Sequence, residues 1–215
     1  MEARTTRESI VKDLDLLSTY FDKYGFTDNK NKVEIVKRDI NEPLRVMVVG
    51  EGKFGKSTLI NSLLGRTDNI AEVGFVPKTW TVDIFHSTNS EEKAEIFSKN
   101  GGSISKSIPE TKLFLKSSEK QNSDSKGLEK SDVFQIKWHI KTQWPKQGID
   151  LVDTPGFAQV KKQDGFESAN LFGGKGITLK TSDEAFWYYY YRADLVLWCI
   201  RADKINDVDT RNMIS

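Results

Sequence analysis

The stretch from Gly50 to Ser57 reads G-E-G-K-F-G-K-S and fits the pattern G-x-x-x-x-G-K-[ST] of a P-loop. Its glycines let the backbone wrap a phosphate without a Cβ clash, and successive N–H groups then point inward as an anion nest. An apolar run, Leu44 to Val49, precedes the motif, and a helical pattern, Lys56 to Leu64, follows it. The motif therefore predicts a phosphate-binding loop between a strand and a helix N-terminus.

Most positions of this motif have an expected role. The predicted nucleotide-binding residues are Gly50, Glu51, Gly52, Lys53, Phe54, Gly55, Lys56, Ser57 and Thr58. Lys56 is expected to reach the β- and γ-phosphates, and the Ser57 hydroxyl is expected to ligate Mg²⁺. We hypothesise that the positive charge of Lys53 stabilises charge developing between the β- and γ-phosphates. The alternative is a solvated lysine that only adds to nucleotide affinity.

A second motif supplies an acidic group for the metal. Residues 148–156 read G-I-D-L-V-D-T-P-G, an apolar strand followed by a D-x-x-G element. The strand carries Asp153 to the carboxyl edge of the sheet, where it can hold Mg²⁺ through water. Gly156 is expected to offer its backbone N–H to a γ-phosphate, so the element senses whether the third phosphate is present.

The stretch between the two motifs, V-P-K-T-W-T-V over 76–82, holds two threonines. A GTPase needs one threonine in a mobile loop at this place, to close the Mg²⁺ shell and hold the attacking water. Thr79 is the preferred candidate for this catalytic and metal-binding role, and Thr81 is the alternative.

The remaining pattern predicts an α/β fold, with a mainly parallel sheet flanked by helices, a hairpin insert and an N-terminal helical extension. The predicted helices lie at 5–23, at 33–40 after a break over 24–32, at 181–191 behind a capping box, and from 207 to 214. The predicted strands lie at 44–49, 81–87, 93–99, 103–107, 134–140, 149–153 and 195–200, the last as a buried run.

Composition narrows the class of function. The 32 lysines and arginines balance 31 acids to a net charge of +1, so no global field favours nucleic acid as a partner. No stretch has the roughly twenty apolar residues of a membrane span. Cys199 is the only cysteine and is expected to be a buried core thiol, which fits a reducing compartment. His86 and His139 are interpreted as too isolated for a metal site and as satisfied or exposed histidines. The aromatic run 186–191 is interpreted as core more readily than as an interface.

The stretch from Gly50 to Gly65, G-E-G-K-F-G-K-S-T-L-I-N-S-L-L-G, resembles the P-loop and first helix of dynamin-like GTPases, especially the bacterial ones. V-P-K-T is similar to their switch I, and D-T-P-G is similar to the start of switch II. The stretch A-D-L-V-L-W, followed by R-A-D, resembles the next core strand. The resemblance covers about 44 to 205.

The resemblance implies a protein that binds GTP and GDP, hydrolyses GTP with Mg²⁺, dimerises through its G domain and is linked to membrane remodelling. Its catalytic residues would be Lys53, Lys56, Thr79 and Gly156, and its metal ligands Ser57, Thr79 and Asp153. Residues 1–42 would form a neck-like extension and residues 43–215 the GTPase (G) domain, with a polar insert near 116–131. The expected location is the cytoplasm, with peripheral attachment to a membrane left open and no nucleic-acid partner.

The guanine-reading element [NT]-K-x-D is absent. The nearest stretch, R-A-D-K over 201–204, is interpreted as the end of a strand, and the true element is expected beyond Ser215, in a longer chain. GTP therefore follows from the resemblance alone. Two alternatives stay open, namely a nucleotide-binding switch or degenerate P-loop module with little or no hydrolysis, and a P-loop ATPase of another lineage.

Overall fold

The computed structural model describes residues 3–51, 54–71, 81–116, 129–156 and 181–204. The chain divides into two compact units, the first ending at Pro43 and the second beginning at Leu44. The predicted helix at 207–214 and most of the polar insert lie outside the described residues.

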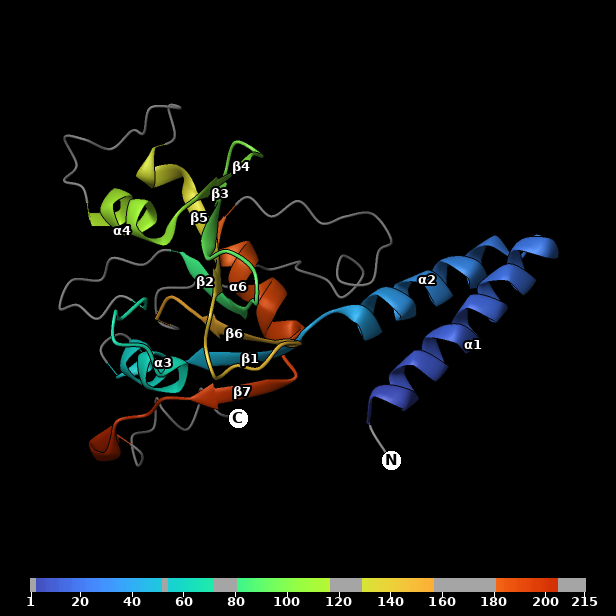
Figure 1. Cartoon of the computed structure of the whole chain (residues 1–215), viewed down its shortest axis with the longest axis horizontal. Coiled ribbons are helices and arrows are strands. Elements are labelled where there is room, and N and C mark those ends of the chain that lie inside the picture. Colours follow the sequence, from blue (N-terminus) through green and yellow to red (C-terminus); the bar gives the residue numbers. More distant parts are fainter. Residues whose placement is uncertain (1–2, 52–53, 72–80, 117–128, 157–180, 205–215) are drawn as a thin grey trace. The chain divides into compact units, whose positions relative to one another are not determined.

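The first unit is a pair of helices, α1 (Ala3–Lys23) and α2 (Thr27–Asn41), that lie side by side (Figure 1). Gly25 has φ 74° and closes α1 with a bond from the Phe26 N–H to the Phe21 carbonyl. The predicted break over 24–32 is wrong from Thr27 onward, because this one glycine is enough to turn the chain. Helix α2 then starts at Thr27, with Asp28 favourably placed in its first turn.

The second unit is built on a sheet with the strand order β4-β3-β5-β2-β6-β1-β7. Its strands are β1 (Leu44–Val49), β2 (Val82–Ser87), β3 (Lys93–Ser98), β4 (Ser103–Lys106), β5 (Val133–Ile140), β6 (Ile149–Asp153) and β7 (Leu195–Trp198). Strand β1 is parallel to β6 and β7, and β2 is parallel to β5, whereas the other pairings are antiparallel. The predicted α/β class is confirmed, with a sheet that is mixed in direction.

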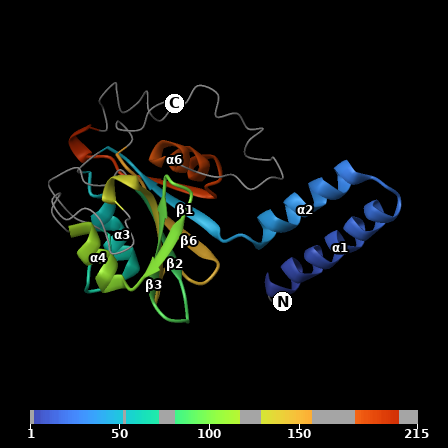
Figure 2. The ribbon, with the colours of Figure 1, turned by 90° about the horizontal axis from the view of Figure 1, so that it is seen from above.

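Helices cover both faces of this sheet (Figure 2). Helices α3 (Lys56–Leu64) and α4 (Ile108–Lys116) pack on one face, where Ile60 and Phe114 join a core around Phe85 and Trp138. Helix α6 (Ser182–Tyr191) packs on the other face, where Phe186 is buried. Short 3₁₀ turns follow at η2 (Lys130–Asp132) and η4 (Ala202–Lys204).

Several predicted elements are confirmed to within a residue or two. Helix α3 begins at Lys56 and ends before Gly65, which adopts φ 63° as its left-handed cap. Strands β3 and β4 form the predicted antiparallel hairpin. Helix α6 opens with the predicted capping box of Thr181 and Glu184.

Two features of the fold differ from expectation. Helix α4 was not predicted, although Ser107 and Glu110 form a reciprocal pair of hydrogen bonds at its start, which is the capping-box signal. Strand β7 is not buried as predicted, since Leu195 is 53% exposed and Val196 is 37% exposed. The reason is its position at one edge of the described sheet.

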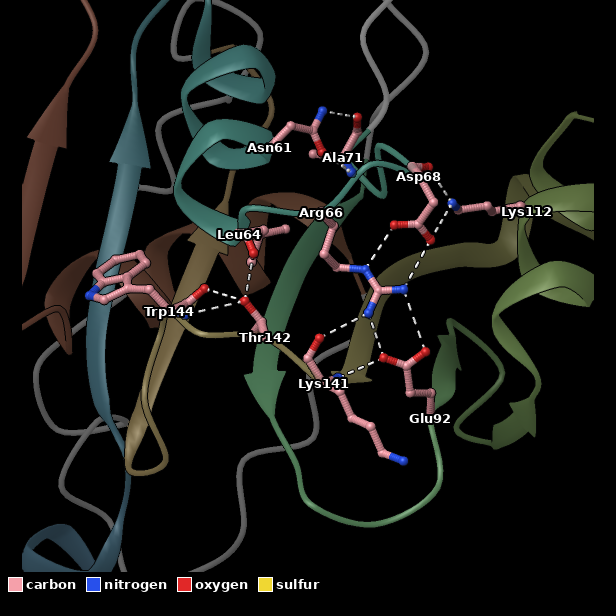
Figure 3. A network of polar contacts seen from close by, with 10 residues as sticks. All are labelled: Asn61, Leu64, Arg66, Asp68, Ala71, Glu92, Lys112, Lys141, Thr142 and Trp144. Atoms are coloured by element: carbon pink, nitrogen blue, oxygen red, sulfur yellow. Dashed lines mark hydrogen bonds and ion pairs between the residues drawn. The ribbon is translucent and has the colours of Figure 1, made fainter.

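A network of ion pairs and hydrogen bonds around Arg66 holds the segment that follows α3 in place (Figure 3). The Arg66 guanidinium donates to both carboxylate oxygens of Asp68 at 2.8 and 3.0 Å, to Glu92 at 2.5 Å and to the Lys141 carbonyl at 3.0 Å. The Lys112 ammonium donates to Asp68 from α4. Hydrogen bonds from Arg66 hold the pKa of Asp68 at about 2, below its ordinary value of 3.8.

We expect Arg66→Met to lower the free energy of unfolding by about 1–3 kcal/mol, because it removes charge-assisted bonds to three partners at once. Arg201 offers a matched control, because it also donates hydrogen bonds to an aspartate two residues later, Asp203. Both of these side chains are more than half exposed. Arg201→Met should cost less than about 1 kcal/mol. Urea unfolding of both variants measures the difference, and equal losses would contradict this view of the network.

Candidate functional site

The P-loop begins where β1 ends, and the chain that leaves β7 lies against it. The Cys199 N–H donates to the Val49 carbonyl at 2.8 Å. Gly50 has φ 150°, and a Cβ at this position would lie 2.4 Å from the Cys199 carbonyl oxygen. Only glycine therefore fits here. Cys199 itself is half-buried beside the loop and packs against the core that includes Ile60, so it lies at the margin of the core and not fully inside it.

Lys56 opens α3 and folds back over the loop. Its ammonium donates to the carbonyls of Gly50 and Glu51, each at 3.0 Å, and the residue is only 8% exposed. Burial lowers the pKa of Lys56, while attraction from Asp153 raises it. The ammonium thus has neutral backbone carbonyls at the start of the loop as its hydrogen-bond acceptors, and phosphate oxygens could replace them.

Asp153 ends β6 and faces the first turn of α3. Its Oδ2 accepts a hydrogen bond from the Ser57 hydroxyl at 3.3 Å. Its Oδ1 is buried and has no hydrogen-bond partner within the described part of the chain. Burial raises the pKa of Asp153 to about 6, against the lowering influence of Lys56 and of the Ser57 bond. The next residue, Thr154, donates to the Val48 carbonyl at 2.9 Å and fastens this turn to β1.

These groups fit a magnesium ion. Mg²⁺ prefers hard oxygen donors, takes one or two protein ligands and keeps several waters. The Ser57 hydroxyl and the Asp153 carboxylate are such donors, and Oδ1, which has no hydrogen-bond partner among the described residues, gives the carboxylate a further lone-pair site. The raised pKa of Asp153 has the same physical cause, a buried negative charge with too few compensating partners.

The structure brings together only part of the predicted site. Lys56, Ser57 and Asp153 meet at one end of the sheet, and Gly156 is buried three residues beyond Asp153. The other described P-loop residues are Gly50, Glu51, Phe54, Gly55 and Thr58, of which Thr58 is exposed. Gly52, Lys53 and Thr79 lie outside the described residues, whereas Thr81 is half-buried just before β2.

One contact of the P-loop was not foreseen from the sequence. The Arg201 guanidinium carbon lies 5.9 Å from the centroid of the Phe54 ring, within cation–π range. Arg201 follows β7, so the R-A-D-K stretch reaches the P-loop from the neighbouring strand. No pattern in the sequence pairs these two residues, because they meet only once β1 and β7 are aligned.

A separate polar cluster crosses four strands. His86 and His139 are register partners on β2 and β5, with ring centroids 5.4 Å apart. Asp150 lies 2.6 Å from His86 Nδ1, and Glu95 lies 3.4 Å from His139 Nε2. The two histidines are therefore neighbours in space, and each has a carboxylate partner. The cluster includes the start of β6, opposite the end that carries Asp153.

The fold and the P-loop motif together are those of a P-loop nucleotide-binding domain. Residues 46–214 match the family model described as the dynamin family, so the chain belongs to the dynamin family. No curated protein matches this chain. Within the described residues, no helix is long and apolar enough to cross a bilayer.

Two solved structures are similar to this chain, and both are described as an oligomerised bacterial dynamin pair that provides a mechanism for long-range sensing and tethering of membranes. The first has 16% sequence identity and a TM-score of 0.46, with 86% of this chain and 30% of that chain covered. The second has 15% identity and a TM-score of 0.44, with 85% and 29% covered. This chain thus spans about a third of the length of the chains it matches.

The buried Asp153 carboxylate makes the stability of the metal-free protein depend on pH. Its pKa in the folded state, about 6, lies above the ordinary 3.8, so the ionised form destabilises the fold. This penalty is absent below about pH 4, grows as the pH rises and is complete above about pH 6. We expect Asp153→Asn to gain up to about 3 kcal/mol at pH 8 relative to the unchanged protein, and little near pH 4.

Urea unfolding in a chelating buffer at several pH values measures this difference. Asp150→Asn is a suitable control, because Asp150 is equally buried on the same strand but lies at the other end. A gain for Asp153→Asn that does not change with pH would contradict the assignment.

Proposed function

We propose that this chain binds GTP, hydrolyses it to GDP and phosphate, and acts as a nucleotide-driven conformational and dimerisation switch linked to membrane remodelling. The observation that carries the proposal is the meeting of Lys56, Ser57 and Asp153 beside the P-loop in a member of the dynamin family. An ammonium, a hydroxyl and a carboxylate in this arrangement match the needs of a triphosphate bound with one divalent cation.

In the proposed reaction, water attacks the γ-phosphorus in line. Lys56 leaves the loop carbonyls for the β- and γ-phosphate oxygens and neutralises charge that builds up there. Thr79 holds the attacking water, and the Gly156 N–H binds the γ end. Ser57, Thr79 and Asp153 would hold Mg²⁺, which when bound would supply Lewis-acid stabilisation of the phosphate oxygens.

The proposed organisation places the GTPase (G) domain from residue 43 onward and a helical neck-like extension over 1–42. Self-association runs across the nucleotide face of the G domain. The protein is cytoplasmic and reaches a membrane as a peripheral partner, through segments that these residues do not include. The net charge of +1 supports no nucleic-acid partner.

A second candidate function is a nucleotide-binding switch with little or no hydrolysis. The contact of Arg201 with the Phe54 ring favours it, because a bulky aromatic side chain held beside the P-loop restricts the approach of a nucleotide. A third candidate is an ATPase of another P-loop lineage. The D-T-P-G element argues against it, and the absent base-reading motif keeps it open.

We expect the purified chain to bind GTP with Mg²⁺ more tightly than ATP, and Lys56→Ala to weaken GTP binding at least about tenfold through loss of the buried ammonium. Titration with labelled GTP and ATP measures both affinities. Lys23→Ala, in the first unit, is the control and should bind as the unchanged chain does. Equal affinity for ATP would favour the third candidate, and no binding of either nucleotide would contradict the proposal.

Lys53 gives a separate prediction about turnover. If its charge stabilises the transition state, Lys53→Ala should lower the rate of GTP hydrolysis at least about tenfold while GTP affinity changes little. Single-turnover hydrolysis, followed at several protein concentrations, measures this rate and reveals dependence on self-association. A variant with normal binding and normal turnover would remove Lys53 from the catalytic set.

A further inference from the structure

A second buried carboxylate faces Asp153 across the sheet. Asp83 is the second residue of β2, and the antiparallel pairing of β2 with β6 makes Asp83 and Asp153 direct register partners. Side chains directly opposite in such a pairing have Cβ atoms about 4.5–5.5 Å apart. Neither the P-loop motif nor the D-x-x-G motif assigns any role to this position.

Both carboxylates point to the face of the sheet that α3 covers. The next pair with the same orientation is Phe85 and Leu151, and both belong to the core that includes Ile60 of α3. The alternating residues Ile84 and Val152 belong to the core on the α6 side. Side chains alternate along a strand, so Asp83 shares the α3 face with Asp153.

A positive charge beside two facing carboxylates is favourable, and the Lys56 ammonium, which attracts Asp153, is one such charge. Asp83 is 7% exposed and Asp153 is 9% exposed, so water screens their repulsion poorly. Like charges directly opposite in a sheet destabilise it. Asp153 Oδ1 adds an independent sign of a ligand, because this buried oxygen has no hydrogen-bond partner among the residues that the structure describes.

We propose that Asp83 is a second carboxylate of the magnesium site, which draws the divalent cation toward Ser57 and Asp153 and binds it through its water shell. Mg²⁺ keeps several of its waters in proteins, so a carboxylate one strand away can act without direct ligation. Asp83 is thus a positioning residue. With Asp83 charged, a nucleotide that arrives without metal meets added repulsion, so nucleotide binding becomes more strongly dependent on Mg²⁺.

This inference rests on the proposed function, because magnesium accompanies the nucleotide there, but the metal alone can test it. In the nucleotide-free chain, MgCl₂ should raise the melting temperature by a few degrees beyond NaCl of equal ionic strength. Asp83→Asn should reduce this shift by more than half, and Asp153→Asn should abolish it. Asp150→Asn, the matched buried aspartate of β6, should keep the full shift.

Direct binding of Mn²⁺, followed by electron paramagnetic resonance on chain shown to be folded by circular dichroism, gives a second readout. Asp83→Asn should weaken Mn²⁺ binding about tenfold, and Asp83→Ser, a smaller neutral variant, should do the same. A full Mg²⁺ shift in Asp83→Asn, unchanged Mn²⁺ affinity, or the absence of any shift in the unchanged chain would overturn the proposal.

The two proposals fail in different ways. If Mg²⁺ stabilises the chain through Asp83 but no nucleotide binds, the GTPase proposal fails and the metal site stands. GTP affinity can be measured once with Mg²⁺ and once with a chelator. If GTP binds and the ratio of these two affinities is the same in Asp83→Asn as in the unchanged chain, the role of Asp83 fails and the nucleotide site stands.

Discussion

The burial of Asp153 between β1 and β2 is the constraint on which the site depends. Its backbone pairs with Val48 on one side and with Asp83 on the other, so three strands fix the position of one carboxylate. The same pairing with β1 sets Asp153 beside the helix that follows the P-loop, where Ser57 reaches it. Because the strands determine this position, the carboxylate stays buried even though its pKa rises to about 6.

Much of the fold could be predicted from local signals. Helix α3 was predicted to the residue, because a P-loop lysine must start a helix and Gly65 ends it. Helix α6 could be predicted because its capping box is readable in the sequence. Prediction failed where tertiary position decides, since the exposure of β7 depends on which strands lie beside it. Helix α4 carries a capping signal at Ser107, but this short stretch between a strand and a polar insert is not predicted as a helix.

The site could be predicted only where a motif names the residue. Lys56, Ser57 and Asp153 could be predicted to lie together because phosphate and metal chemistry imposes their spacing on the sequence, and the fold does bring them together. Their roles toward phosphate and metal stay predictions. Two other pairs depend on strand register between segments that are far apart in the chain. Asp83 lies opposite Asp153, and His86 lies opposite His139. One sequence carries no local trace of register, so neither pair could have been found before the sheet was assembled.

Amide hydrogen exchange along the whole chain, with and without Mg²⁺ and a non-hydrolysable GTP analogue, tests most directly whether this end of the sheet holds a nucleotide and its metal. The account predicts slower exchange from Gly50 to Thr58 and around Asp153, and unchanged exchange near His86 and His139 at the other end of β2 and β5. Protection that appears only near the histidine pair, or nowhere in the chain, would contradict it.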